Sequence, residues 1–251
     1  MKVVILAGGL GSRLGSITET VPKPLIEINN KPLLIRIMEH YSNYGYNDFI
    51  IALGYKGHLI KSYFQSLNLI FSKSVNFNFK NKKINYELDK KFINKWNVQL
   101  VETGNKTLTG GRLKRLQPYL KDDSFFLTYG DGLSDINIRE LYQFHKKSGS
   151  ITTVTAVHPN ARFGNIIIDN KNIVKSFKEK KPLIKEWING GFFVMNKDIF
   201  SYLKGDFCEL EKDPLEQLSK DKKLSAFKHN GFWHCVDTKR DIQNLEEILI
   251  D

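Results

Sequence analysis

A glycine-rich loop near the start of the chain holds the first residues whose types and spacing could do chemistry. An apolar run leads into Gly8-Gly9-Leu10-Gly11, and Arg13 and Lys23 follow it. Glycines at a strand-to-helix turn let backbone N–H groups approach phosphate oxygens. Glycines alone also suit a mere tight turn, but a guanidinium and an ammonium beside them favour a polyphosphate. The prolines on either side of Lys23 restrict its backbone, which favours a positioned charge.

Two familiar glycine motifs do not fit this loop. Leu14 stands where a dinucleotide fingerprint needs its third small residue. The loop also lacks the Gly-Lys-Ser/Thr ending of a Walker A motif. The sequence therefore indicates a phosphate cradle of another kind.

Two aspartates follow strand-like runs and are candidates to hold a divalent cation. Asp131 lies between two glycines after an apolar run, and Asp237 follows the run at 232–236. Ligands bind outside the carboxyl ends of strands in open α/β sheets, and Mg²⁺ takes one or two carboxylates together with phosphate oxygens. Asp131 could instead be a turn residue, and Asp237 could be a helix N-cap, a task for which Thr238 and Asp241 compete.

A set of separated motifs resembles the sugar-phosphate nucleotidyltransferases. The run Leu6-Ala7-Gly8-Gly9-Leu10-Gly11-Ser12-Arg13-Leu14 followed by Pro22-Lys23-Pro24 is similar to the N-terminal signature of that family. Ser16 stands where many members have proline. Further stretches resemble the glucose-1-phosphate cytidylyltransferase branch: Gly54-Tyr55-Lys56-Gly57, Trp96-Asn97-Val98, Thr103-Gly104, Thr109-Gly110-Gly111-Arg112, Tyr129-Gly130-Asp131-Gly132, Asn189-Gly190-Gly191-Phe192-Phe193 and Gly231-Phe232-Trp233.

The resemblance implies a GT-A-like fold and Mg²⁺-dependent nucleotidyl transfer. In that branch the substrates are CTP and α-D-glucose 1-phosphate and the products are CDP-glucose and pyrophosphate, used in polysaccharide biosynthesis. The choice of cytosine comes from the branch alone. Two alternatives stay open: the same chemistry with another nucleoside triphosphate or sugar 1-phosphate, and a non-catalytic homologue that binds nucleotide sugars in a regulatory role.

The family's functional positions can be transferred onto matching residues. The resemblance implies catalytic roles for Arg13, Lys23, Asp131 and Asp237, with the two aspartates as metal ligands. It implies nucleotide contacts from Leu6, Ala7, Gly8, Gly9, Leu10, Gly11, Ser12, Arg13, Lys23, Thr107, Arg112 and Gly130.

The sugar phosphate needs its own contacts. Lys180 could pair with its phosphate, and Glu179 and Asn189 could bind hydroxyl groups, with Gly190 permitting close approach. Composition alone would favour a charged turn at 178–181. Tyr129 and Trp187 are candidate sugar-facing aromatics, although a buried aromatic is more often only part of the core.

The element pattern predicts a sheet that would bring these residues together. Strands and helices alternate through the first 65 residues, which is typical of a parallel sheet with crossover helices. We expect one α/β domain over residues 1–251: a Rossmann-like, doubly wound mixed sheet with antiparallel additions and a protruding β-hairpin insertion at about 75–95. The predicted elements are strands at 2–7, 49–53, 98–101, 125–129, 151–157, 192–195, 224–227 and 232–236, helices at 33–44, 58–64, 110–120, 136–147 and 241–250, and a strand pair at 163–169 and 173–179.

Composition narrows the class of protein. The 41% hydrophobic and 12% aromatic residues fit a globular chain, and no apolar run is long enough for a membrane span. The net charge of +11 comes from scattered lysines with no aromatic-interleaved stripe, so we expect no nucleic-acid partner and no membrane partner. With only Cys208 and Cys235 and no signal-peptide pattern, we expect a cytoplasmic protein. A homo-oligomer is expected, with the hairpin as a candidate contact.

Overall fold

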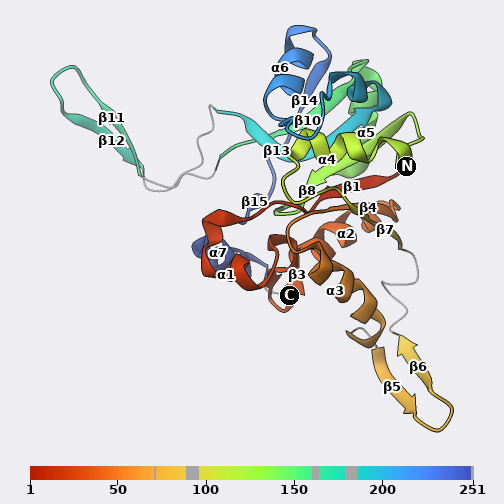
Figure 1. Cartoon of the computed structure of the whole chain (residues 1–251). Coiled ribbons are helices and arrows are strands. Elements are labelled where there is room, and N and C mark those ends of the chain that lie inside the picture. The colour runs from red at the N-terminus through yellow and green to blue at the C-terminus, as the bar shows by residue number, and fades with distance from the viewer. Residues whose placement is uncertain (71, 89–95, 160–163, 179–185, 250–251) are drawn as a thin grey trace.

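A seven-stranded mixed sheet forms the centre of the molecule (Figure 1). The computed structural model describes all residues except 71, 89–95, 160–163, 179–185 and 250–251. The strand order is β14-β10-β13-β8-β1-β4-β7. The strands are β1 (Val3–Leu6), β4 (Asp48–Leu53), β7 (Asn97–Glu102), β8 (Ser124–Tyr129), β10 (Thr152–Val157), β13 (Ile188–Asn196) and β14 (Leu224–Lys228).

Both faces of the sheet are covered, as the uninterrupted apolar strands predicted. Along β1, Val3 and Ile5 belong to one buried cluster and Val4 and Leu6 to another, because successive side chains point to opposite faces. Helices α2 (Leu33–Asn43), α3 (Gly57–Ile70), α5 (Ile138–Ser148) and α7 (Lys239–Ile248) add apolar residues to the first cluster. Helices α4 (Thr109–Arg115) and α6 (Asp213–Lys220) add theirs to the second. The doubly wound prediction is confirmed.

The directions of the strands decide where a ligand can sit. β7, β4, β1 and β8 run parallel, so their carboxyl ends share one edge of the sheet. β13 runs antiparallel to β8, with Phe192 opposite Thr128. The first residues of β13 therefore lie at the same edge as the last residues of β8. This edge gathers the glycine loop, Asp131 and Asn189 from distant parts of the sequence.

Several predicted boundaries were wrong. The helix predicted at 110–120 ends at Arg115 and is followed by a 3-10 turn, Gln117–Tyr119, because Pro118 has no N–H to continue a helix. Gly190 and Gly191 lie inside β13 rather than before it. The strand Trp233–Cys235 (β15) does not close the main sheet but pairs with β9 (Gly132–Ser134). Short elements were also missed: α1 (Ser16–Thr20), the strands β2 (Glu27–Ile28) and β3 (Lys31–Pro32), and 3-10 turns at Ser12–Leu14 and Lys23–Leu25. The sequence also predicts a helix with Asp198 near its start, and the structure has a 3-10 helix there, Lys197–Tyr202.

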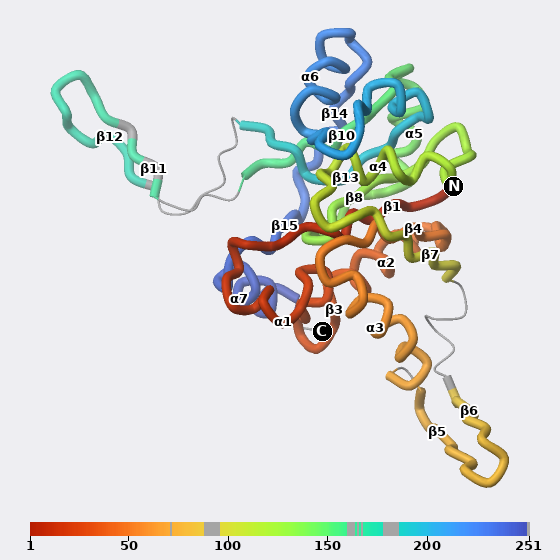
Figure 2. Tube along the Cα trace, in the orientation of Figure 1, coloured from red at the N-terminus to blue at the C-terminus, as the bar shows by residue number. Residues whose placement is uncertain are grey.

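Two antiparallel ribbons project from the body, as the tube in Figure 2 shows. The predicted hairpin is confirmed as β5 (Ser72–Asn78) paired with β6 (Lys83–Leu88). The predicted strand pair is confirmed as β11 (Asn165–Ile168) with β12 (Val174–Lys178). Within the described part of the chain, the helices are too short or too polar to cross a bilayer.

Candidate active site

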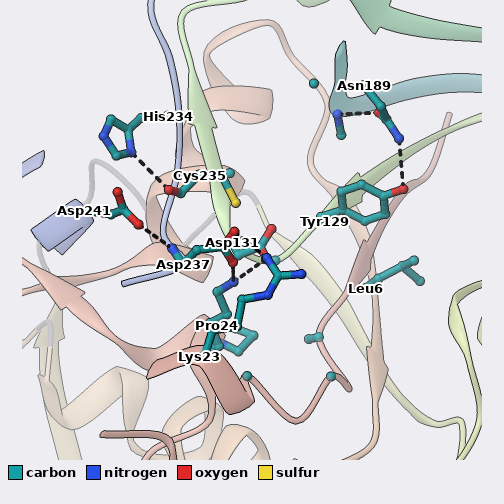
Figure 3. A pocket seen from close by; sticks show the side chains of 18 of the residues that line it. Leu6, Lys23, Pro24, Tyr129, Asp131, Asn189, His234, Cys235, Asp237 and Asp241 are labelled. Carbon is teal, nitrogen blue, oxygen red and sulfur yellow. Dashed lines mark hydrogen bonds and ion pairs between the residues drawn. The ribbon is translucent and has the colours of Figure 1, made fainter. Parts of the chain in front are cut away.

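A pocket of about 1320 Å³ opens at the carboxyl edge of the sheet. Its walls come from the glycine loop, the segment before α4, the end of β8, the start of β13, the strand at Trp233–Cys235 and one face of α7. Figure 3 shows two groups of side chains in it: one around Lys23, Asp131 and Asp237, and another at Tyr129 and Asn189. Most residues predicted from the sequence line this pocket: Leu6, Ala7, Gly8, Gly9, Gly11, Ser12, Arg13, Lys23, Thr107, Arg112, Tyr129, Gly130, Asp131, Asn189, Gly190 and Asp237.

Four charged side chains form a connected cluster on one side of the pocket. Lys23 Nζ donates to Asp131 Oδ2 at 2.7 Å and to Asp237 Oδ1 at 2.9 Å. Arg13 Nη1 donates to the other oxygen of Asp237, at 2.7 Å. The Lys23 side chain is only 13% exposed, whereas that of Arg13 is 74% exposed. Residues far apart in the sequence thus meet as two carboxylates and two cations.

Lys23 and Asp237 keep their charges at neutral pH. Burial alone would lower the pKa of Lys23, but the charge and hydrogen bond of Asp131, together with the hydrogen bond to Asp237, raise it overall. Burial alone would raise the pKa of Asp237, but its contacts with Lys23 and Arg13 lower it overall. An ammonium of raised pKa and a carboxylate of lowered pKa form a fixed ion pair rather than an acid–base pair.

Asp237 is not the N-cap of α7, the alternative role that the sequence left open. Thr238 caps α7, and its hydroxyl and the Asp241 carboxylate form a reciprocal capping box. Asp237 lies one residue earlier and faces the pocket. Asp131 lies between β8 and β9, and Val236 N donates to its carbonyl oxygen at 3.0 Å. This backbone bond draws the segments carrying the two aspartates together.

The donor atoms fit a divalent cation. Atoms of Asp131, Cys235 and Asp237 lie within 4.8 Å of one another. The two carboxylates are the hard ligands that Mg²⁺ prefers, and they already attract a cation, the ammonium of Lys23. Burial, then the charge of Asp131, raises the pKa of Cys235 to about 12, so its thiol stays protonated at neutral pH. The site therefore suits an oxygen-preferring metal.

Arg112 has a position that the sequence did not predict. The side chain is 4% exposed and lies beneath the glycine loop. Its guanidinium donates to the carbonyl oxygens of Gly8 (2.8 Å), Leu53 (3.1 Å) and Gly104 (2.7 Å). A β-carbon on Gly8 would lie 2.3 Å from Arg112 Nη1, so glycine is needed there for space. Arg112 therefore links three segments of the pocket through hydrogen bonds. Its predicted contact with the nucleotide stays a prediction.

On the other side of the pocket, hydrogen bonds join several side chains. One of them, Glu211, was not predicted from the sequence as a site residue. Tyr129 Oη donates to Glu211 Oε1 at 2.5 Å, and Asn189 Nδ2 donates to Tyr129 Oη at 3.3 Å. Thr109 Oγ1 donates to the other Glu211 oxygen at 2.6 Å. Burial, followed by the charge of Glu211, raises the pKa of Tyr129, so the phenol stays neutral. No sequence signal marked Glu211, because it lies between elements and meets its partners only through the fold.

The loop before α6 brings Glu211 to the pocket by packing on the start of α4. Leu108 N donates to Asp206 O at 2.8 Å, and Gly111 N donates to Cys208 O at 3.1 Å. A β-carbon on Gly111 would lie 2.3 Å from Asp206 O, so this backbone contact requires glycine. The pair Gly110-Gly111 thus serves loop packing, which sequence reasoning had not foreseen.

The remaining predicted residues lie elsewhere. Leu10 is 60% exposed and does not line the pocket. Trp187 packs on His158, with ring centroids 3.9 Å apart, and is also absent from the lining. Glu179 and Lys180 lie outside the described residues. Other pocket residues that were not predicted include Trp233, His234 and Cys235 from the β15 region and Arg240, Asn244 and Glu247 from α7.

Fold and pocket together define the class: an α/β protein with a doubly wound sheet and a ligand pocket at the carboxyl ends of its strands. The sequence model of the Nucleotidyl transferase family matches residues 2–247, so the chain belongs to that family. It is 46% identical over 247 residues to the glucose-1-phosphate cytidylyltransferase of Salmonella typhimurium (strain LT2), covering 98% of this chain and 95% of the relative. It is 36% identical over 255 residues to the "Probable glucose-1-phosphate cytidylyltransferase" of Bacillus subtilis (strain 168), covering 99% and 96%.

A solved structure shows the same fold. The crystal structure of a UDP-glucose pyrophosphorylase complexed with UDP-glucose matches with a TM-score of 0.70, covering 98% of this chain and 97% of the other. At 18% identity this likeness concerns the fold alone. The predicted family and GT-A-like architecture are confirmed.

Proposed function

We propose that this enzyme transfers the cytidylyl group of CTP to α-D-glucose 1-phosphate, giving CDP-glucose and pyrophosphate. The observation that carries the proposal is the joining of Arg13, Lys23, Asp131 and Asp237 in one ion-pair cluster beside the glycine loop. The similarity to cytidylyltransferases over nearly the full chain supports the choice of substrates.

The residues have separate tasks in this reaction. A phosphate oxygen of the sugar phosphate attacks the α-phosphorus of CTP, and pyrophosphate leaves from the opposite side. The attacking oxygen is already ionised at neutral pH, so no general base is needed. The glycine-loop N–H groups, Arg13 and Lys23 hold the phosphates and offset their charge. Lys23 suits this task because its raised pKa keeps it protonated.

A divalent cation is the proposed cofactor, and Mg²⁺ is the expected ion. Asp131 and Asp237 would hold it, and when bound it neutralises phosphate charge. The Lys23→Ala variant should lose most turnover while still folding. Full activity of a well-folded Lys23→Ala protein would refute the catalytic role.

The hydrogen-bonded chain on the other side supports a place for the sugar. Tyr129, Asn189 and Glu211 offer both donors and acceptors to hydroxyl groups. Tyr129 and Asn189 lie away from the group around Lys23, Asp131 and Asp237 (Figure 3). Nucleotide contacts by Thr107 and Gly130 remain part of the proposal because both line the pocket.

A substrate panel tests the proposal. CTP, UTP, GTP, ATP and dTTP would each be combined with several sugar 1-phosphates, and pyrophosphate release would be measured. The highest kcat/KM is expected for CTP with glucose 1-phosphate. A clear preference for another pair would replace these substrates while keeping the chemistry. Binding without release for every pair would favour the non-catalytic alternative.

We further infer that the chain forms homo-oligomers through its ribbons. Isolated two-stranded ribbons are marginally stable in water. Both ribbons expose large apolar side chains, among them Phe79 at 87%, Ile173 at 61% and Phe177 at 65%. A second copy of the chain would cover them. Light scattering should show a mass above one chain, reduced by Phe79→Ser or Phe177→Ser; a monomer would refute this inference. Cytoplasmic location and a role in polysaccharide biosynthesis stay predictions.

A further inference from the structure

The ammonium of Lys23 sits at the point between the two proposed metal ligands. One nitrogen atom lies 2.7 Å from an oxygen of Asp131 and 2.9 Å from an oxygen of Asp237. The other oxygen of Asp237 accepts a hydrogen bond from Arg13 at 2.7 Å. Both oxygens of Asp237 are therefore in contact with side-chain cations, and a metal ion bound to this carboxylate would compete with them for its lone pairs.

The Lys23 ammonium and a divalent metal ion compete for the place between Asp131 and Asp237. Mg²⁺ binds oxygen at about 2.0–2.1 Å in near-octahedral geometry. An ion at that distance from both oxygens that Lys23 now contacts would lie within a few ångströms of the ammonium, and the two positive charges would repel each other. The ammonium can leave because a lysine is a compact charge on a flexible stem.

The ammonium of Lys23 offsets the repulsion between the carboxylates of Asp131 and Asp237. Asp131 and Asp237 have side chains only 27% and 17% exposed. Two partly buried carboxylates facing each other would repel unless a cation lies between them. Lys23 supplies that charge from within the chain. It also lines the same pocket as Gly8 and Gly9, where a phosphate would offer it another anionic partner.

We propose that Lys23 holds the place of the divalent cation in the free protein, so that the ammonium and the metal ion exclude each other and exchange at this point. The proposal rests on the metal requirement of the function assigned above. It makes Lys23 a residue that regulates metal entry, in addition to its proposed contact with phosphate.

Metal binding without substrate provides the first test. Mn²⁺, a spectroscopic stand-in for Mg²⁺, would be titrated into the full-length protein and free Mn²⁺ followed by electron paramagnetic resonance. Lys23→Met should bind Mn²⁺ at least about tenfold more tightly than the native chain, within the range usual for coupled sites. Asp131→Asn should bind it more weakly than the native chain does.

Arg13→Met is the matched control. It removes an equal charge 2.7 Å from Asp237, against 2.9 Å for Lys23, but the Arg13 contact is to Asp237 and does not bridge the two carboxylates. We expect a gain in Mn²⁺ affinity of less than about threefold, since an exposed cation is screened by solvent. Equal gains for the two variants would indicate a general charge effect and would overturn the proposal.

Amine labelling of the native chain provides a second test that does not depend on a variant folding. Mass spectrometry would follow acylation of Lys23, with exposed Lys222 as internal reference. Saturating Mg²⁺ alone should raise the Lys23 labelling rate several-fold, because the displaced ammonium becomes accessible. An unchanged rate at saturating metal would overturn the exchange. Neither test uses CTP or sugar, so failure here is separable from failure of the proposed function, which the substrate panel decides.

Discussion

Arg112→Met is the substitution that best tests how the pocket is held together. The guanidinium reaches three segments that are distant in sequence: the glycine loop through Gly8 O, the end of β4 through Leu53 O, and the segment before α4 through Gly104 O. It also donates to Thr103 Oγ1 at 2.8 Å. Methionine keeps a long side chain but removes every donor.

The size of the effect follows from these contacts. Hydrogen bonds to a charged group contribute roughly 1.5–3 kcal/mol each, so simple addition over four bonds would be too large. The Gly8 and Leu53 carbonyls keep other donors, Tyr55 N and Thr103 N. Methionine also removes the desolvation cost of the guanidinium, a cost seen in the lowered pKa of Arg112, for which burial is the main cause. We expect a net loss of about 3 kcal/mol in the free energy of unfolding.

Urea unfolding followed by circular dichroism measures this loss from the shift in midpoint. Arg112→Lys should lose less, because one ammonium keeps the charge but cannot span all three carbonyls. Arg115→Met is the matched control on the same helix, since Arg115 pairs with Asp206 at the surface and should change stability far less. A loss below about 1 kcal/mol for Arg112→Met, with a higher KM for nucleotide, would refute the positioning role and favour direct contact.

Three further predictions follow from the pocket. Glu211→Gln should raise the KM for the sugar phosphate about tenfold with little change in the KM for nucleotide, because a hydrogen bond to a charged group is weakened; Glu209→Gln, which does not line the pocket, is the kinetic control. Gly8→Ala should unfold in less urea because its β-carbon would meet a guanidinium at 2.3 Å, whereas Gly9→Ala has open space and should keep its midpoint. Contacts with neighbouring cations outweigh burial and lower the pKa of Asp237, so its stabilising effect, present above the unfolded-state pKa of about 3.9, is lost as the pH falls through the folded-state value. Asp237→Asn should therefore flatten the fall in urea midpoint below about pH 4; an unchanged slope would contradict this reasoning.

The sequence alone determined the family, the sheet and the identity of the charged cluster. Uninterrupted apolar runs such as Val3–Leu6 predict strands buried on both faces, and the helical spacing after Pro32 predicts the covering helix. Lys23 follows the glycine loop and indicated a cation for phosphate, and Asp131 and Asp237, which follow strand-like runs, indicated a metal site. Apolar runs, helical spacing and residue types are local properties, so they can be recognised in the sequence without knowing the fold.

Only the tertiary structure decided which groups touch. Glu211 joins the pocket because its loop packs on two glycines of α4, a contact that no local pattern encodes. Arg112 could be placed beside the nucleotide loop from its motif, but only the fold shows it buried among backbone carbonyls. The bridging of Asp131 and Asp237 by Lys23 likewise needs β9 and β15, which lie far apart in the sequence, to pair with each other. Hydrogen bonds and ion pairs act over about 3–4 Å, and the sequence sets the residue types while the fold sets those distances.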